Sequence, residues 1–309
     1  MTIVHDFVGW PSGALHLAIG VFDGVHVGHQ ALVRGVAERA REESATPMAA
    51  TFDPLPIEVL APGAPPSALS DIDERTQLLA AAGAKAVVVF HFTPEFAALP
   101  PAEFARRLAE AGGLRRVCVG DDFQFGHDRS GNVDTLRELG KAHGFTVDVA
   151  TPVMMDGRVV SSTHIRNALL AGGVAEAARL LGRDFAVTGV VEHGDKRGRA
   201  LGFPTINLDV PRARLLPRNG IYAVWATVEG RRFMAASSLG VRPTFGGGDR
   251  RLEAFLLDFE GDLYGDRIQV EFVKRLRDEL RFASAADLAQ QITKDVDQTR
   301  KALSERPLS

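Results

Sequence analysis

The chain of 309 residues is long enough for two domains, each with its own hydrophobic core. It is 45% apolar and 24% charged, as is usual for a globular protein, and its net charge of −3 argues against nucleic-acid binding by bulk electrostatics. No signal pattern or membrane-spanning stretch is present, and the single cysteine, Cys118, cannot form an internal disulfide. We therefore expect a cytoplasmic protein that acts on small molecules, without nucleic-acid or membrane partners. The sequence specifies no oligomeric state.

The first half of the chain alternates short apolar runs with helical stretches. We expect strands at 15–22, 48–52, 85–92, 116–120 and 146–150, with helices near 29–43, 72–82, 102–111 and 133–143. This alternation predicts a Rossmann-like α/β domain, in which helices cover both faces of a parallel sheet. Ligands of such sheets bind beyond the carboxyl ends of the strands.

The turn after the first of these strands carries the strongest chemical signal. The strand leads into Asp23-Gly24, and His26 and His29 stand where the next helix begins. A helix start offers unpaired N–H groups and the positive end of the dipole to a phosphate, and Gly28 would leave room for it. The segment resembles the H-x-G-H motif of nucleotidylyltransferases. The alternatives are two solvated loop histidines or a metal site, to which only Asp23 could add a nearby ligand.

A second candidate phosphate site is the start of the helix that runs from about residue 161 to 170. Ser161 or Ser162 is a suitable N-cap, and Ser162 and Arg166 share one face of that helix. A hydroxyl, free N–H groups and a guanidinium at a helix start can bind triphosphate oxygens. The alternative is a capped helix with a solvated arginine.

The pattern changes after residue 184 to short alternating runs separated by glycines. We expect strands at 186–191, 222–228, 233–237, 252–257 and 267–272, followed by a helix over 285–303. These features predict a small antiparallel β-barrel closed by a helix. The sequence therefore predicts two domains, 1–184 and 185–309.

The glycine-rich basic segment 189–207 is the candidate site of this second domain. Thr205 and Asn207 are neutral oxygen ligands two residues apart, so in a strand they point to the same face and suit Mg²⁺, which takes its other ligands from phosphate and water. A basic surface hairpin explains the segment equally well. Glu253 interrupts an apolar run, and it lies either on the solvent face or in a site, where it could act as a general base toward a hydroxyl.

These motifs, in this order, resemble the bacterial bifunctional FAD synthetases, in which riboflavin kinase is fused to FMN adenylyltransferase. The matches are G-V-F-D-G-V-H-V-G-H at 20–29, T-F-D-P at 51–54, V-G-D-D-F-x-F-G at 119–126, S-S-T-x-I-R at 161–166, L-G-R at 181–183, G-D-K-R-G-R-x-L-G-F-P-T-x-N at 194–207, G-V-R-P-T-F at 240–245, L-E at 252–253 and D-L-Y-G at 262–265. The resemblance implies two reactions. The C-terminal half would phosphorylate riboflavin to FMN with ATP, and the N-terminal half would adenylylate FMN to FAD with release of pyrophosphate.

The resemblance also implies the role of each site residue. Glu253 would be the catalytic base of the kinase, Thr205 and Asn207 would contact Mg²⁺ and phosphate, and His26 and His29 would stabilise charge on the phosphates. The residues implied in nucleotide binding are Gly20, Phe22, Asp23, Gly24, His26, His29, Ser162, Thr163, Arg166, Gly194, Lys196, Gly198, Arg199 and Thr205. Those implied in flavin binding are Phe52, Pro54, Pro56, Asp122, Phe123, Phe125 and Arg277. ATP would be the co-substrate, Mg²⁺ the cofactor, and riboflavin, FMN and FAD the substrates and products.

Two departures and two rival functions accompany this interpretation. Ile206 replaces the usual alanine beside the proposed metal ligands, and Gln124 stands where many relatives have arginine. An adenylyltransferase for a pantetheine or nicotinate phosphate would share the H-x-G-H half, but it would not explain residues 185–309. A flavin-binding protein without catalysis would bind flavin and leave ATP unchanged.

Overall fold

The computed structural model describes residues 1–65, 67–192, 203–241 and 250–305. Contacts between residues divide the chain into two units, Met1–Ser162 and Thr163–Ser309, which are described separately below. The expected fold class is confirmed, because a parallel sheet with helices is followed by a closed antiparallel barrel with a C-terminal helix. The proposed domain boundary at residue 184 stays a prediction. The division by contacts falls at the first residues of the helix Ser162–Ala171.

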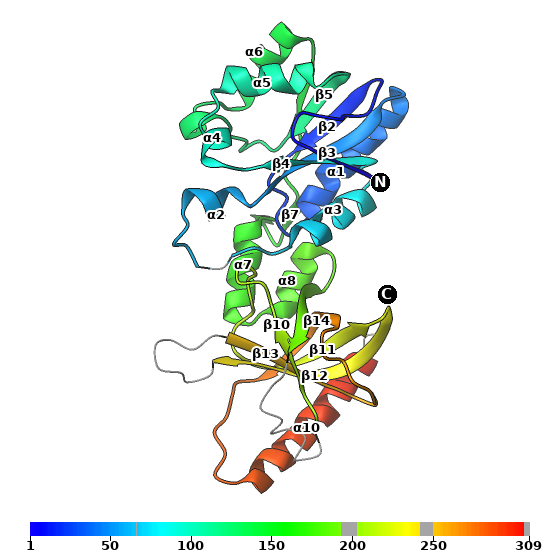
Figure 1. Ribbon diagram of the computed structural model, residues 1–309, viewed down its shortest axis with the longest axis vertical. Helices are drawn as coiled ribbons and strands as arrows, with labels where there is room; N and C mark the ends of the chain where they lie inside the picture. The colour runs from blue at the N-terminus through cyan, green and yellow to red at the C-terminus, as the bar shows by residue number, and fades with distance from the viewer. Residues whose placement is uncertain (66, 193–202, 242–249, 306–309) are drawn as a thin grey trace. The chain divides into compact units, whose positions relative to one another are not determined.

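The first unit is built on a six-stranded sheet whose neighbouring strands all pair in parallel (Figure 1). The strand order is β1-β4-β3-β2-β5-β6. The strands are β1 (Thr2–His5), β2 (Leu15–Ile19), β3 (Thr46–Asp53), β4 (Ala86–His91), β5 (Leu114–Val119) and β6 (Thr146–Val149). From β2 the chain builds outward through β3 and β4, then returns to place β5 on the other side of β2. Ligands of open α/β sheets bind where the strand order reverses in this way, which here is at the end of β2.

Helices cover both faces of this sheet because its strands alternate apolar side chains between two cores. On one face, Ala18 and Ala49 pack with Val33 and Val36 of α1 (Val27–Glu42) and with Leu79 of α3 (Ile72–Ala81). The other face packs against α5 (Pro101–Glu110) and α6 (Val133–His143), on the opposite side of the sheet in Figure 1. The shorter elements are α2 (Pro56–Leu60), α4 (Pro94–Ala97), the 3-10 turn η1 (His127–Arg129) and the hairpin of β7 (Met154–Met155) and β8 (Arg158–Val159).

The second unit begins with two helices and continues as a closed barrel. The helices are α7 (Ser162–Ala171) and α8 (Val174–Leu181), and α8 packs against β9 and β14. The barrel closes in the order β10-β13-β12-β11-β14-β9, with antiparallel pairing throughout. Its strands are β9 (Phe185–Glu192), β10 (Ile206–Asp209), β11 (Gly220–Val228), β12 (Arg231–Val241), β13 (Arg250–Leu256) and β14 (Arg267–Arg277).

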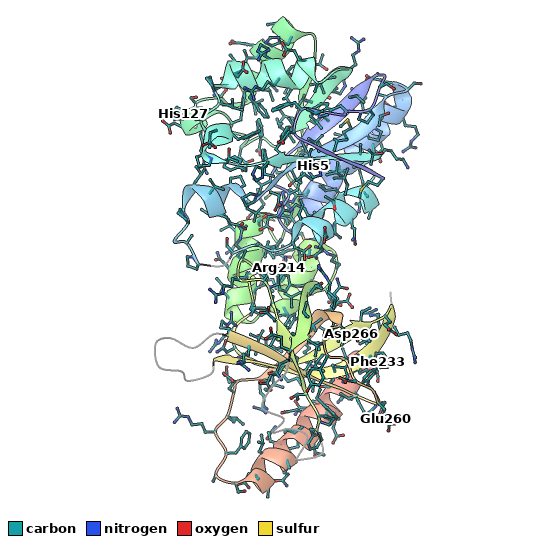
Figure 2. All side chains as sticks on the ribbon, in the orientation of Figure 1. His5, His127, Arg214, Phe233, Glu260 and Asp266 are labelled. Carbon is teal, nitrogen blue, oxygen red and sulfur yellow. The ribbon has the colours of Figure 1, made fainter. Side chains whose placement is uncertain are left out.

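Apolar residues on alternate positions of the barrel strands form its interior. Tyr222, Val224, Ile268 and Phe272 are each fully buried. Arg214, labelled in Figure 2, is only 4% exposed, and its Nη2 donates to the carbonyl oxygen of Ala186 on β9 (2.6 Å). The C-terminal helix α10 (Ala285–Ser304) contacts β11, β12 and β14, as expected for a closing helix.

The structure differs from the expected elements mainly at turns and short segments. The first predicted strand, which corresponds to β2, ends at Ile19 rather than at residue 22. The chain turns there, because Phe22, Gly24 and Val25 adopt left-handed backbone conformations that a strand does not contain. The edge strand β1 and the helices α2, α4 and α8 were not predicted. Three of these four elements are only four or five residues long, which is too short for a clear periodic pattern.

Candidate active sites

The turn between β2 and α1 is strained and held by buried contacts. Phe22 and Val25 have φ values of 52° and 38°, which side chains with a Cβ rarely adopt. Asp23 is 1% exposed, and its carboxylate accepts hydrogen bonds from the backbone N–H groups of Leu69 (2.8 Å) and Ser70 (3.1 Å). The N–H of Gly24 in turn donates to Ser70 Oγ (2.9 Å). Asp23 therefore fastens the turn to the segment before α3, and its role in nucleotide binding stays a prediction.

The two histidines of the turn stack on each other at the start of α1. His26 is the N-cap residue, and its Nδ1 accepts from the backbone N–H of His29 (3.3 Å). The two rings are 3.6 Å apart between centroids and inclined by 19°. A Cβ on Gly28 would lie 3.1 Å from the His26 ring, so this glycine makes room for the histidine, and its expected role in the close approach of a phosphate stays a prediction. The predicted pair of imidazoles at a helix start is thus present as one stacked unit.

Burial keeps His29 neutral. The pKa of His29 lies well below its usual value of 6.5, first because the ring is withdrawn from water and then because His26 and Arg75 lie nearby. The ring of Phe22, 1% exposed, meets the His29 ring edge-on at 5.1 Å between centroids. A neutral imidazole carries one N–H, so His29 can donate one hydrogen bond to an anionic oxygen at neutral pH.

The second predicted phosphate motif contributes one contact to the same turn. Ser162 is the last residue of the first unit, and its Oγ donates to the carbonyl oxygen of Asp23 (2.9 Å) in the turn after β2. Thr163 is exposed and Arg166 is half-buried, and both belong to α7 in the second unit. Nucleotide contacts by these three residues stay predictions.

The predicted flavin-binding residues of the first unit follow β3 and β5, the two neighbours of β2. Phe52 and Pro54 lie at the end of β3, and Pro56 is the first residue of α2. After β5, Asp122 is exposed, while the rings of Phe123 and Phe125 stack at 5.4 Å between centroids. Since β2, β3 and β5 are adjacent and parallel, the two segments and the histidine turn all lie beyond the carboxyl ends of the strands, on the same side of the sheet.

Sequence reasoning missed the aromatic and charged groups that surround these loops. Phe52 meets the rings of Phe90, Phe92 and Phe96 at 5.7–6.1 Å between centroids, so it belongs to a larger aromatic cluster. Burial, and secondly the nearby Asp53, raise the pKa of Glu58 on α2. The regular 3.6-residue and 2-residue periods carry no signal for such contacts between separate loops.

In the barrel, strand register brings the predicted kinase residues together. Asn207 on β10 is directly opposite Glu253 on β13. Residues opposite each other in an antiparallel pair point to one face, with Cβ atoms about 5 Å apart. The same row of residues continues through Ser238 and Ile221 to Arg277 on β14. Glu253 and Asn207 therefore point to the same face of the barrel wall, opposite to the buried Leu252 and Ala254, and the role of Glu253 as a base stays a prediction.

Two features of this barrel face were not predicted. Phe255, two residues beyond Glu253, meets the ring of Phe203 edge-on at 5.4 Å between centroids. The guanidinium of Arg277, a predicted flavin-binding group, forms a two-bond pair with the carboxylate of Asp295 on α10 (2.8 and 2.6 Å). The flavin-binding role of Arg277 stays a prediction, and its acidic partner was not predicted from the sequence.

The oxygen atoms at the start of β10 suit Mg²⁺ chemically. Thr205 is exposed and Asn207 half-buried, and hydroxyl and amide oxygens are among the ligands that Mg²⁺ accepts beside phosphate and water. Within residues 1–65, 67–192, 203–241 and 250–305, no three His, Cys, Asp or Glu side chains form a metal-binding group. The predicted nucleotide contacts Gly194, Lys196, Gly198 and Arg199 lie outside the described residues.

Comparison with known proteins covers both units. A family model described as FAD synthetase matches residues 12–164, and one described as riboflavin kinase matches residues 181–303. The bifunctional riboflavin kinase/FMN adenylyltransferase of Pseudomonas fluorescens is 42% identical over 284 residues, 91% of each chain. The protein of the same description from Escherichia coli K12 is 38% identical over 295 residues, 94% of each chain.

A solved structure agrees with the whole fold. It is named as a macrolide-efflux protein from Streptococcus pneumoniae, and it has a TM-score of 0.88 and 31% sequence identity, covering 97% of this chain and 99% of that one. Its name states an activity that neither matching family model states. In the described part of the present chain, no helix has both the length and the apolar character needed to cross a membrane.

Proposed function

The chain belongs to the family of bifunctional riboflavin kinase/FMN adenylyltransferases, and from this premise we propose how its residues carry out the two reactions. The chain phosphorylates riboflavin with ATP to give FMN, and adenylylates FMN with a second ATP to give FAD and pyrophosphate. The observation that supports the residue assignment best is the register that sets Glu253 opposite Asn207 in the barrel.

In the kinase reaction, Glu253 accepts the proton of the ribityl 5′-hydroxyl of riboflavin. The freed oxygen bonds to the γ-phosphorus of ATP as the bond to the β-phosphate oxygen breaks, and ADP leaves. Thr205 and Asn207 hold Mg²⁺ through their side-chain oxygens, and the ion neutralises charge on the phosphates when it is bound. Arg277 contacts the flavin, and Asp295 holds its guanidinium.

In the adenylyl transfer, a phosphate oxygen of FMN attacks the α-phosphorus of ATP. The bond from that phosphorus to the β-phosphate breaks, and pyrophosphate leaves. The attacking phosphate is already an anion, so no side-chain base is required, and catalysis comes from position and hydrogen bonding. His26 and His29 donate to the phosphates, and Ser162, Thr163 and Arg166 hold the β- and γ-groups. The flavin lies against Phe52, Phe123 and Phe125.

The test is a time course of the purified chain with riboflavin, ATP and Mg²⁺, in which the flavins are separated by chromatography. We expect FMN first and FAD later. Glu253→Gln should abolish FMN formation while adenylylation of added FMN persists. His29→Asn should lower adenylylation about 10²- to 10³-fold, as for removal of one transition-state donor, and leave the kinase unchanged.

The outcomes separate the proposed assignments. Equal loss of both activities in Glu253→Gln would contradict the two-site model. A tenfold effect or less in His29→Asn would make His29 a loop residue without a catalytic contact. Omission of Mg²⁺ should stop FMN formation, and full activity without any divalent cation would contradict the metal assignment.

The remaining proposals concern the surroundings of the enzyme. We place it in the cytoplasm, where ATP and free flavins meet, and assign it small-molecule substrates without nucleic-acid partners. The net charge of −3 supports the second point. Fractionation of cells and nucleic-acid binding at low salt test these two statements.

A further inference from the structure

A buried arginine lies beneath the edge of the sheet where the adenylyl-transfer residues gather. We propose that Arg75 of α3 is a positioning residue for adenylyl transfer, which fixes the histidine turn and the start of the flavin loop relative to each other. The inference rests on the proposed roles of His29 and Phe52. Arg75 is 2% exposed, and among the described residues it is the largest side chain by volume that is fully buried.

Arg75 contacts the flavin side of the site directly. Its Nη1 donates to the carbonyl oxygen of Phe52 (2.7 Å) and to Thr51 Oγ1 (3.3 Å), both at the end of β3. Phe52 is followed immediately by the segment proposed to contact the flavin. The guanidinium therefore holds the end of β3, from which that segment continues.

The same guanidinium reaches the histidine turn by two short paths. In the first, Thr51 Oγ1 donates to the carbonyl oxygen of Val21 (2.8 Å), the second residue after β2. In the second, Arg75 Nε donates to Ser70 Oγ (3.4 Å), which also accepts the N–H of Gly24 (2.9 Å). The loop before α3 is held as well, because Arg75 Nη2 donates to the carbonyl oxygen of Ser70 (3.2 Å).

Arginine suits this place because its planar fork presents five donors in fixed directions. The contacts of Arg75 described above use Nε, Nη1 and Nη2, and their acceptors belong to two separate segments of the chain. A lysine would retain the positive charge but could not reach all these acceptors in the same geometry. The position thus requires the shape of the side chain as well as its charge.

Arg75 also acts electrostatically on the site. Burial has the largest effect on the pKa of His29, and His26 and Arg75 each lower it further. Substitution of Arg75 by an uncharged residue should therefore raise the pKa of His29. Substitution by lysine, which keeps the charge, should leave that pKa nearly unchanged. Comparison of the His29 pKa in the two variants therefore distinguishes the effect of the charge of Arg75 from the effect of its hydrogen-bond geometry.

The experiment compares Arg75→Met and Arg75→Lys in the full-length enzyme. In Arg75→Met we expect KM for both FMN and ATP to rise and kcat/KM of adenylylation to fall about 10²-fold, the effect of a misplacement near 1 Å. Arg75→Lys should recover part of this loss. The kinase reaction of the same proteins should be unchanged. NMR titration of the histidine rings, assigned with His29→Asn, should show the raised pKa in Arg75→Met alone.

Arg116→Met is the matched control for lost stability. Arg116 pairs with Asp148 (3.0 Å) and Glu43 (3.0 Å) near the amino ends of the strands, at the opposite edge of the same sheet. Its loss should destabilise the first unit and leave KM for FMN and ATP unchanged. If Arg75→Met lowered kcat only in proportion to its folded fraction, with both KM values and the His29 pKa unchanged, the proposal would be overturned.

Ser70→Ala keeps the inference testable if Arg75→Met does not fold. This change removes a hydroxyl oxygen shared by Gly24 and Arg75, so it should raise KM for FMN and ATP in the same direction by a smaller factor. Unchanged KM values in both Ser70→Ala and Arg75→Lys would overturn the proposal. Full activity of His29→Asn would instead refute the assignment of the site itself.

Discussion

Several side chains proposed to act in catalysis also support the turn in which they lie. His26 caps α1 through Nδ1 and stacks on His29, while Ser162 donates its hydroxyl proton to the carbonyl oxygen of Asp23. A substitution at such a residue removes a structural contact together with any contact to a phosphate. Kinetic effects at the turn are therefore interpretable only beside a measurement of stability.

Two histidines with lowered pKa values predict that the first unit loses stability in acid. Burial lowers the pKa of His16 on β2 and of His29, so in the folded protein both remain neutral below the usual pKa of 6.5. The unfolded chain binds these two protons as the pH falls through 6.5, which favours unfolding. The free energy of unfolding should fall below pH 6.5, by at most about 1.4 kcal/mol per pH unit for each histidine, until the pH passes the lowered folded values.

Urea denaturation at pH 7.5, 6.5 and 5.5 measures this loss. In His16→Asn the dependence on pH should be weaker, and in the double variant with His29→Asn weaker still. Both histidines belong to the first unit, so the transition of the barrel should not share this part of the pH dependence. An equal slope in wild type and double variant would show that other groups cause the acid sensitivity.

At the residue scale, the sequence indicated which side chains have suitable chemistry, but it did not indicate which residues they contact. Glu253 was proposed as a site residue because it is a carboxylate that interrupts an apolar run, and His26 and His29 were proposed because they stand at a helix start. The partners of Asp23 lie 46 and 47 residues along the chain, and no periodic pattern connects positions so far apart. Arg75 resembles an ordinary solvated helix arginine in the sequence, and only its burial distinguishes it.

At the scale of elements, α10 is joined to the barrel by two paired arginines that differ in exposure. Arg277 of β14 pairs with Asp295, whose side chain is 4% exposed, and Gln291 also donates to that carboxylate (2.9 Å). Arg300 pairs with Asp258, whose side chains are 46% and 72% exposed. Each pair forms two hydrogen bonds. Substitutions in the two pairs therefore allow a buried contact of α10 to be compared with an exposed contact of the same helix.

Asp295→Asn should destabilise the barrel by about 3 kcal/mol, because it leaves a poorly solvated guanidinium without its charged partner. If Arg277 contacts the flavin, KM for riboflavin should rise as well. Asp258→Asn, the matched control, should change neither stability nor KM measurably, since exposed pairs contribute little. Chemical denaturation and riboflavin saturation curves check both. Equal effects of the two substitutions would contradict the distinction between the pairs.

The type and order of most elements could be predicted, but their register could not. Regular alternation of apolar runs located five parallel strands and five barrel strands, whereas the short strand β10 (Ile206–Asp209) was not expected as an element. Its pairing with both β9 and β13 closes the barrel and sets Asn207 opposite Glu253. That register depends on the closure of the whole barrel, which a window of neighbouring residues does not contain.

At the scale of the whole molecule, α7 and α8 decide how the chain can be divided. Division by contacts assigns both helices to the second unit, whereas the sequence predicted a boundary at residue 184. The buried residues of α8 include Val174, Leu180 and Leu181, and the helix packs against β9 and β14. A fragment that starts at residue 185 lacks these contacts.

Fragments 163–309 and 185–309 test this division. We expect 163–309 to fold and to phosphorylate riboflavin. Fragment 185–309 should be less stable by several kcal/mol, because each large apolar side chain loses about 1.5–3 kcal/mol of burial energy. Thermal unfolding and the kinase assay compare the two. Equal stability and activity would place the functional boundary at residue 184.

If Glu253 and Asn207 act together in the kinase reaction as proposed, that activity depends on the register of β13 against β10, because a shift by one residue reverses the face to which each side chain points. Loss or gain of one residue inside β13 before Glu253 would turn its carboxylate toward the barrel interior and bring an apolar neighbour to the face of Asn207. Insertions in the surface turns would leave this relation intact. Over evolutionary time, we therefore expect length changes to accumulate in the loops of this barrel, and strands β10 and β13 to keep their lengths even where their side chains diverge.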